Sequence, residues 1–291
     1  MMNGTIYPKA TLEEYGYREH KVLKALWKIT KWVLVAFTIF MLYIAVGVIA
    51  VQSFNASSST TEWGGFTFDN YLQMFDKRSL TNSIRNTFML SIVATMIAGV
   101  LGTFVAIGMF YLPPKIKSKL MLLNNIPLLN ADIVTGISLM LIFSLFLPLN
   151  RQLFGFGTIL LAHIYFILPY IILSVLPKMK EIDANLMDAS MDLGVKPFKS
   201  LIKVIIPAIK GGIFSGVILA FTISFEDFVV GYFTTGNGFN TLSIWIYSSI
   251  GRKSLFPGVY AFSTALTFIS ALLILGYAII KKGKGRHAKK N

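Results

Sequence analysis

Residues 178–212 read KMKEIDANLMDASMDLGVKPFKSLIKVIIPAIKGG, a charged stretch between two long apolar segments. Its first part predicts a short helix, because apolar residues recur at helical spacing. Gly194 then lets the chain turn without a side-chain penalty. A second helix is expected from Pro197, running past Pro207 into the next apolar segment. An exposed helix-turn-helix of this kind offers apolar area to a partner protein. The apolar face of its first helix consists of Ile182, Leu186, Ala189 and Leu193.

The chain as a whole is too apolar for an ordinary soluble domain. It has 291 residues, of which 55% are hydrophobic and 14% charged, and its mean hydropathy is +0.66. Soluble domains carry about 25% charged residues. The composition therefore indicates an integral membrane protein. The absence of cysteine excludes disulfides, thiolate metal sites and cysteine nucleophiles in this chain.

Six apolar segments are candidates to cross a bilayer, which takes roughly 20 residues per helix. Five contain no charged residue, and the other, at about 205–230, is interrupted by Lys210 near its start and by Glu226 and Asp227 near its end. The sequence thus predicts an all-α membrane protein with six transmembrane helices. The five uncharged segments are Trp32–Val51, Asn86–Leu112, Ile133–Asn150, Gln152–Pro177 and Ser254–Ile280.

The basic residues predict the orientation of these spans. Most of the 27 Lys and Arg residues lie in the N-terminal segment, in loops 113–120 and 178–210, and in the tail from Lys281. By the positive-inside rule, these segments and both termini are cytoplasmic. Because topology accounts for most of the formal charge of +14, no nucleic-acid partner is expected.

This topology divides the chain into three parts. Residues 1–31 form a cytoplasmic segment in which HKVLKALWKITKWV (20–33) is either an amphipathic helix on the membrane surface or a basic flank of the first span. Residues 32–280 form the six-span domain, including the cytoplasmic loop at 178–207 between spans four and five. Residues 281–291 are a basic cytoplasmic tail, which we expect to contact anionic lipid of the bilayer.

Small residues recur four apart in two of the spans. In lipid, such residues let the backbone of a second helix approach closely. We therefore expect helix-packing surfaces here rather than contacts with a ligand. The residues are Ala94, Ala98, Gly102 and Ala106 in the second span, and Gly212 and Gly216 in the fifth.

No catalytic or metal site is expected. His163 lies within the fourth span, and the other two histidines, His20 and His287, lie in the cytoplasmic ends. A lone intramembrane histidine more often makes an interhelical hydrogen bond than serves catalysis. The sequence has no metal-ligand spacing and no G-x-x-x-x-G-K-[ST] phosphate loop. Energy for any driven process would come from a partner or from an ion gradient.

The loop between spans four and five also carries a family motif. DASMDLG (188–194), nine further residues and VIIP (204–207) resemble the coupling motif of ATP-binding-cassette importer permeases: Glu-Ala-Ala, three residues, Gly, nine residues and Ile-x-Leu-Pro. Asp, Ser, Val and Ile replace the family's Glu, second Ala, Ile and Leu. Four other stretches are similar to the C-type permease subunit of the spermidine/putrescine branch, although Ala131 stands where relatives commonly have Pro. They are VQSFN (51–55), NADIVTGISLMLIF (130–143), HIYFILPYII (163–172) and SFEDFVVGYFTTG with TLSIWIYS (224–248).

The resemblance implies a type I importer permease fold in the bacterial plasma (inner) membrane. A second homologous permease would complete the channel, an ATPase dimer would dock beneath the coupling helices, and an extracytoplasmic polyamine-binding protein would deliver the cargo. ATP and Mg would be bound by the ATPase, so this chain would hold no cofactor and would not be an enzyme. The residues implied to couple to the ATPase are Asp188, Ala189, Ser190, Asp192, Leu193, Gly194 and Pro207.

Three carboxylates lie outside the tails, loops and coupling region: Asp132, Glu226 and Asp227. A charge at the bilayer centre costs about 3 kcal/mol on insertion scales, so it usually faces a bundle interior or a water path. Polyamines carry ammonium groups on an apolar chain, which suits carboxylates interleaved with aromatic rings. Adjacent helix residues point about 100° apart, so one acid of the pair would face the path, and we favour Asp227. The expected substrate path is Asp132, Phe225, Glu226, Asp227 and Tyr232.

Other interpretations stay open. Glu226 and Asp227 would alternatively be solvated at the outer interface or paired with Arg252 or Lys253, and Asp132 would cap a broken helix. The favoured function is that of a polyamine permease subunit. The alternatives are the same machinery with another small organic cation or other solute, a secondary transporter that works alone, and, least favoured, a membrane-embedded enzyme.

Overall fold

The computed structural model describes residues 21–57, 59, 61–146, 154–183, 185–236, 238–250 and 256–287. This part of the chain is mostly helical, with an isolated antiparallel bridge between Asn55 and Phe66. The all-α prediction is confirmed. In chain order the elements are α1 (Lys21–Gln52), α2 (Asp69–Leu72), the 3₁₀ turn η1 (Gln73–Phe75), α3 (Arg78–Tyr111), α4 (Pro114–Leu129), α5 (Asp132–Ser144), α6 (Phe156–Glu181), α7 (Leu186–Asp192), α8 (Pro197–Ser200), the π-turn η2 (Leu201–Ile205), α9 (Ile206–Ala208), α10 (Lys210–Glu226), α11 (Val229–Thr234), α12 (Leu242–Ile250) and α13 (Gly258–His287).

Apolar helices stand at all six predicted spans, but the fifth is broken and the third is preceded by a helix that meets it at a sharp bend. α1, α3 and α6 are each long and apolar enough to cross a membrane. α4 with α5, and the segment Pro197–Ala208 with α10, pass the same test as pairs bent by 104° and 73°. The sixth is α13, whose described apolar part covers Gly258–Leu272. The unbroken helix predicted for the fifth span is therefore wrong, whereas the bend of the α4–α5 pair lies just before the predicted third span, Ile133–Asn150.

The third span differs most from the prediction. Residues 113–120, expected as a loop, are instead the start of α4, which has Pro114 in its first turn, where its missing N–H has no helical partner to lose. A second proline, Pro127, lies inside α4 and removes a helical hydrogen bond just before the helix ends. The expected boundary between spans three and four, at 150–152, lies outside the described residues.

The chain ends are described only in part. Residues 1–20 and 288–291 lie outside the described residues, so most of the expected N-terminal segment and the end of the tail have no structural account. From Lys21 the chain is helical without interruption to Gln52, so residues 21–31 continue directly into the first span.

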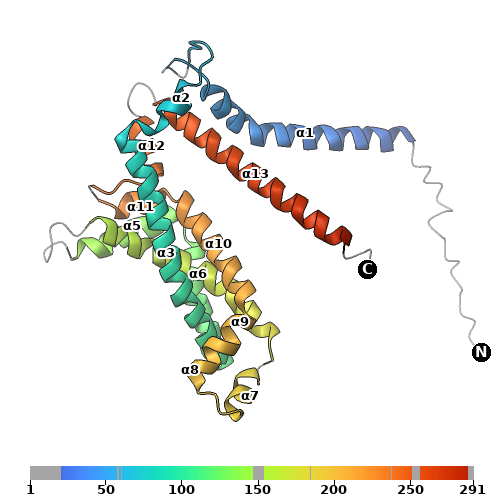
Figure 1. Ribbon diagram of the computed structural model, residues 1–291, viewed down its shortest axis with the longest axis vertical. Helices are drawn as coiled ribbons and strands as arrows, with labels where there is room; N and C mark the ends of the chain where they lie inside the picture. The colour runs from blue at the N-terminus through green and yellow to red at the C-terminus, as the bar shows by residue number, and fades with distance from the viewer. Residues whose placement is uncertain are drawn as a thin grey trace, which may run out of the picture.

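The core lies between α3, α6 and α10, which run alongside one another in Figure 1. Ala94, Ala98 and Ala106 are fully buried. A Cβ atom added at Gly102 would lie 2.9 Å from Cγ2 of Ile171, and one at Gly216 would lie 3.2 Å from the Cα of the same isoleucine. The small residues therefore let both helices approach α6 closely, and the predicted packing surfaces are confirmed.

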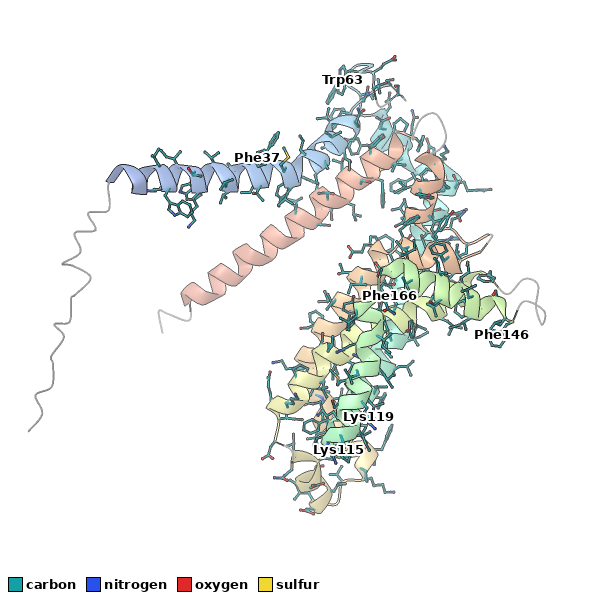
Figure 2. The ribbon with its side chains drawn as sticks, turned by 180° about the vertical axis from the view of Figure 1, so that it is seen from behind. Phe37, Trp63, Lys115, Lys119, Phe146 and Phe166 are labelled. Atoms are coloured by element: carbon teal, nitrogen blue, oxygen red, sulfur yellow. The ribbon has the colours of Figure 1, made fainter. Side chains whose placement is uncertain are left out.

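The two ends of the bundle differ. α7 and α8 lie at one end and α2 at the other (Figure 1), and Lys115 and Lys119 of α4 share the end that carries α7, whereas Trp63 lies at the opposite end (Figure 2). The loop beside α2 is ordered by Asn55, whose side chain is 1% exposed and donates hydrogen bonds to the Gln52 side chain and the Glu62 carbonyl.

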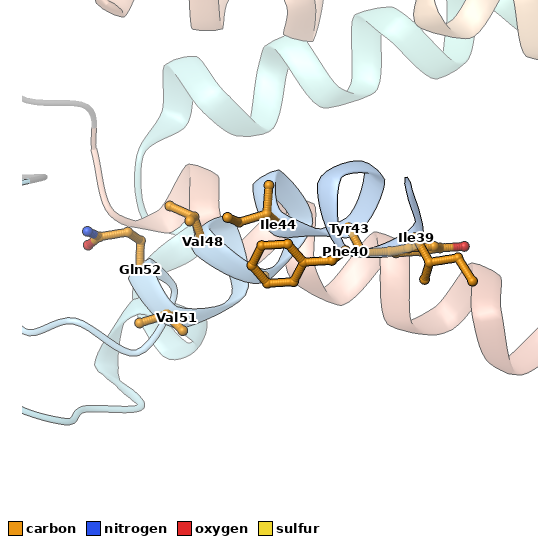
Figure 3. A pocket seen from close by; sticks show the side chains of 8 residues that line it. Ile39, Phe40, Tyr43, Ile44, Val48, Val51 and Gln52 are labelled. Carbon is orange, nitrogen blue, oxygen red and sulfur yellow. The ribbon is translucent and has the colours of Figure 1, made fainter. Parts of the chain in front are cut away.

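α1 and α13 diverge from the bundle and meet near α2 (Figure 1). No residue in the apolar window of α1 is buried within the chain. One face of this helix carries an apolar groove of about 670 Å³ (Figure 3). An apolar helix left uncovered by its own chain has to be covered by lipid or by another protein. The groove is lined by Ile39, Phe40, Tyr43, Ile44, Gly47, Val48, Val51 and Gln52.

Candidate functional site

The fifth span ends in a break that separates the two adjacent acids. α10 stops at Glu226, Asp227 is extended with φ −61° and ψ 134°, and α11 begins at Val229. The Asp227 carboxylate accepts hydrogen bonds from the backbone N–H groups of Val230 (3.2 Å) and Gly231 (2.8 Å). It thereby satisfies first-turn donors of α11 that have no helical partner. The prediction of a continuous helix through residue 230 is wrong because this cap starts a new helix.

The two carboxylates therefore have different surroundings. The side chain of Asp227 is 4% exposed, and its Oδ2 lies 3.4 Å from Nε2 of His163 on α6. Glu226, the last residue of α10, is exposed. Asp227 is the acid expected to face the path, but its carboxylate is turned into the protein and accepts hydrogen bonds from backbone donors. Glu226 is the acid of the pair that a solute could reach.

His163 makes the interhelical hydrogen bond expected of a lone intramembrane histidine. Its Nδ1 lies 2.8 Å from Oγ of Ser224 on α10, and the imidazole is 1% exposed. The alternative pairing of the acids with Arg252 or Lys253 lies outside the described residues.

Three aromatic rings gather beside the break. The rings of Phe228 and Tyr232 lie 5.4 Å apart between centroids, and Tyr247 of α12 lies 4.8 Å from Phe228 and 5.5 Å from Tyr232. We call these three residues the aromatic cluster. Tyr232 and Tyr247 remain about half exposed. The sequence interpretation missed Tyr247, although it stands in the quoted stretch TLSIWIYS, because only the turn between α11 and α12 brings it to Phe228.

Phe225 does not join the aromatic cluster. Its ring lies 5.0 Å from that of Phe88 on α3 and 5.8 Å from that of Phe221, one turn earlier in α10. The structure thus separates the five expected path residues, since only Tyr232 belongs to the cluster and Glu226 lies at the end of the preceding helix.

A cavity of about 460 Å³ adjoins the aromatic cluster. Tyr232 contributes to its wall, and Thr235 and Asn240 give it polar groups. Gly236, with φ +61°, turns the chain at its edge, and a side chain there would collide with Phe154. The aromatic cluster therefore shares Tyr232 with a cavity whose wall carries polar groups. The cavity is lined by Met140, Phe154, Tyr232, Phe233, Thr235, Gly236, Asn240 and Ile244.

Asp132 lies at the other broken span. It is exposed and is the first residue of α5, directly after the extended residues Asn130 and Ala131. Gly136, one turn later, packs against α11, since an added Cβ would lie 3.3 Å from the carbonyl oxygen of Val229. α5 thus braces α11, and the two breaks belong to one packed unit.

The coupling loop folds as the predicted helix-turn-helix, with a different distribution of its side chains. Leu186 packs against the core, whereas Ala189 is exposed and Leu193 is 85% exposed. The single apolar face inferred from spacing is wrong, because α6 ends at Glu181 and α7 starts afresh at Leu186, which breaks the register with Ile182. α7 therefore presents apolar surface outward.

Ser190 lies inside this loop rather than on its surface. It is buried, donates to the carbonyl of Met187 at 2.7 Å and hydrogen-bonds the buried Ser200 hydroxyl of α8. Gly194 has φ +82°, as the predicted turn requires. The pair of serines ties α7 to α8. Asp188, Asp192 and Gly194 are exposed.

Pro207 lies two residues before the bend below α10. A proline clashes with the carbonyl four residues earlier, and the preceding turn, η2, is widened into a π-turn. The helix axis then turns by 73° at Ile209. The loop and the fifth span are thus joined by a bent connection.

Within the described ranges, no group of three or more His, Asp or Glu side chains is placed to hold a metal ion.

Comparisons with known proteins agree with this architecture. The family of binding-protein-dependent transport system inner membrane components matches residues 101–285. The spermidine/putrescine transport system permease protein PotC of Escherichia coli K12 is 30% identical over 243 residues, covering 84% of this chain and 90% of that protein. The putrescine transport system permease protein PotI of the same organism is 29% identical over 266 residues, covering 88% and 90%.

A solved structure supports the fold. A chain from a bacterial ABC transporter that imports the acidic polysaccharide alginate matches with a TM-score of 0.60, covering 87% of this chain and 95% of its own. At 12% identity, this match bears on the fold alone. The fold is that of a type I importer permease. By family match and by identity to relatives over most of its length, this chain belongs to the binding-protein-dependent inner membrane permeases of bacterial ABC importers.

Proposed function

We propose that this chain is a membrane-spanning permease subunit of an ATP-driven importer for the polyamines spermidine and putrescine. The observation that carries the proposal is the aromatic cluster of Phe228, Tyr232 and Tyr247, which begins two residues after the exposed Glu226 in the sequence. A carboxylate pairs with an ammonium group, and ring faces attract the cation while they contact its methylene chain. The similarity to PotC, of a spermidine/putrescine transport system, and to PotI, of a putrescine transport system, favours the same cargo.

The proposed complex contains a second homologous permease, an ATPase dimer and an extracytoplasmic polyamine-binding protein. This chain forms half of the translocation path, and the uncovered apolar surface of α1 supports contact with the second permease or with lipid. ATP and Mg are bound by the ATPase, so the chain itself acts as a transport subunit without enzymatic activity.

The proposed contact with the ATPase is the outward surface of α7. Asp188, Ala189, Asp192 and Leu193 are exposed there, and Gly194 completes the turn. Ser190 acts from inside by holding α7 to α8, and Pro207 shapes the connection to α10. Movement of α7 would therefore be passed to the fifth span as a rigid-body rotation.

In the proposed orientation, the end that carries α7 faces the cytoplasm, and so do both termini. The lysines of α4 at that end support it. Asp132 is proposed to line the path from the start of α5. Phe225 and Asp227 are not proposed to line the path. Phe225 packs against α3, and Asp227 caps α11.

The test is uptake into proteoliposomes that contain the complete complex and its binding protein. We expect labelled putrescine or spermidine to accumulate with ATP, and Glu226→Gln to raise the KM for uptake while the complex assembles normally. Glu62→Gln, the same change in the outer loop, is the matched control and should transport as the wild type does. Uptake of a different solute in preference to both polyamines would refute the cargo, and unchanged kinetics in Glu226→Gln would refute the site.

A further inference from the structure

A buried histidine links three separate elements next to the proposed path. His163 of α6 meets Ser224 of α10 through Nδ1 at 2.8 Å and faces Asp227, between α10 and α11, through Nε2 at 3.4 Å. The imidazole is 1% exposed and the aspartate side chain 4%. Both groups are buried, whereas Glu226 is exposed, so their role differs from that of Glu226.

The partners of His163 define how its nitrogens are used. A carboxylate only accepts hydrogen bonds, so Nε2 carries a proton toward Asp227, while Nδ1 faces the Ser224 hydroxyl, which can donate to it. At 3.4 Å the Nε2 contact is longer than a normal N–H···O bond, and Nε2 has no hydrogen-bond partner in the described structure. A small approach of α11 toward α6 would complete this bond.

Asp227 transmits the position of His163 to the start of α11. Its two oxygens cap the N–H groups of Val230 and Gly231. The contact is crowded, since a Cβ atom at Gly231 would lie 3.1 Å from Oδ2 of Asp227 and 3.7 Å from Nε2 of His163. The orientation of this carboxylate therefore fixes where α10 stops and α11 begins.

We propose that His163 is a positioning residue for transport. By holding the Asp227 carboxylate against α11, it keeps the break in the fifth span in the geometry that exposes Glu226 and places Tyr232 in the aromatic cluster. His163 acts through Asp227 and does not touch the cargo. This inference rests on the proposed function of the site, but the geometry of the break can be measured without any cargo.

Three variants of His163 distinguish the contribution of Nδ1 from that of Nε2. In His163→Gln the terminal amide reaches about as far as Nε2 and keeps a donor for Asp227. In His163→Asn the amide reaches only as far as Nδ1 and keeps the contact with Ser224, and His163→Ala removes both. If His163 only fills space, His163→Gln and His163→Asn should behave alike. If it positions Asp227, His163→Asn should instead behave like His163→Ala.

The measured quantity is thiol labelling in the complete complex. Because the chain has no cysteine, Val230→Cys supplies its only thiol, at a position that is fully buried at the start of α11. We expect labelling by a water-soluble maleimide to rise about 2- to 30-fold with His163→Ala or His163→Asn, as for loss of a helix cap, and to stay at the wild-type rate with His163→Gln. Ile167→Cys, buried one turn along α6, is the control and should stay protected.

Three results would overturn the proposal. They are an unchanged labelling rate of the Val230→Cys thiol when His163→Ala is added, equal rates in His163→Gln and His163→Ala, or a parallel rise at the control position, which would mean that the histidine merely holds the whole fold. Uptake should follow the same order, with His163→Gln close to the wild type and the other two slower. If wild-type complex fails to transport polyamines, the proposed function falls, while the labelling still decides the role of His163.

Discussion

The close approach of α3 to α6 predicts the effect of one added methyl group. In Gly102→Ala, the new Cβ would lie 2.9 Å from Cγ2 and 3.0 Å from Cβ of Ile171. Carbon atoms pack best at about 3.5–4.0 Å, so both contacts are too short. Ile171 is fully buried, and its Cβ is fixed to the backbone of α6. The two helices therefore have to separate, and overpacking of this kind costs about 1–3 kcal/mol.

Gly108→Ala is the matched control. Gly108 lies in the same helix, is exposed, and has nothing within 4 Å of an added Cβ. Both substitutions remove a helical glycine, a gain of about 1 kcal/mol in helix propensity, which largely cancels when the two variants are compared. The difference between them thus isolates the packing cost at Ile171.

The assay is the melting temperature of the purified complex in detergent. For a chain of a few hundred residues, 1 kcal/mol shifts the midpoint by about 2–4 °C, so Gly102→Ala should melt about 2–12 °C below Gly108→Ala. Equal midpoints, or a higher one for Gly102→Ala, would refute the close packing of α3 on α6.

Three further predictions concern the coupling loop and the path. Leu193→Asp should lower the cargo-stimulated ATPase activity of the reconstituted complex about tenfold or more, because it removes an anchor of the interface with the ATPase. The melting temperature of the complex should not change, and normal stimulation would rule out this contact. Gly194→Ala should destabilise the loop by about 1 kcal/mol, because φ is +82°, and weaken retention of the ATPase during purification; full retention would count against the turn. Tyr247→Ala should raise the uptake KM about 2- to 30-fold while Tyr247→Phe keeps it, and equal KM values would exclude a ring–cation contact.

Helix-packing faces and tight turns can be predicted from the sequence, because residue periodicity and spacing determine them. The stripe from Ala94 to Ala106 identifies the packing face of α3 because small residues four apart leave few alternatives in lipid. The turn at Gly194 follows in the same way, since the structure needs a positive φ there. The family resemblance is confirmed by the family match and the relatives, while the coupling role that it implies for the loop stays a prediction.

The breaks in the spans could not be predicted in this way. The apolar run from 205 to 230 predicts one helix. Helix α10 instead ends at Glu226, because the Asp227 carboxylate accepts hydrogen bonds from the first turn of α11 and faces His163, 64 residues earlier in the sequence. Tyr247 joins the aromatic cluster for a similar reason, since its neighbours come from another helix. Hydropathy records how apolar a segment is, whereas the position of a break depends on tertiary partners.

The break before α5 also has an electrostatic consequence for a positively charged solute. The first turn of a helix carries about half a positive elementary charge, so a helix that starts beside a cation path would repel what passes. Asp132 is the first residue of α5, and its carboxylate changes the balance at that end from about +0.5 to about −0.5. With this carboxylate in place, the start of α5 would not repel a cation that passes it.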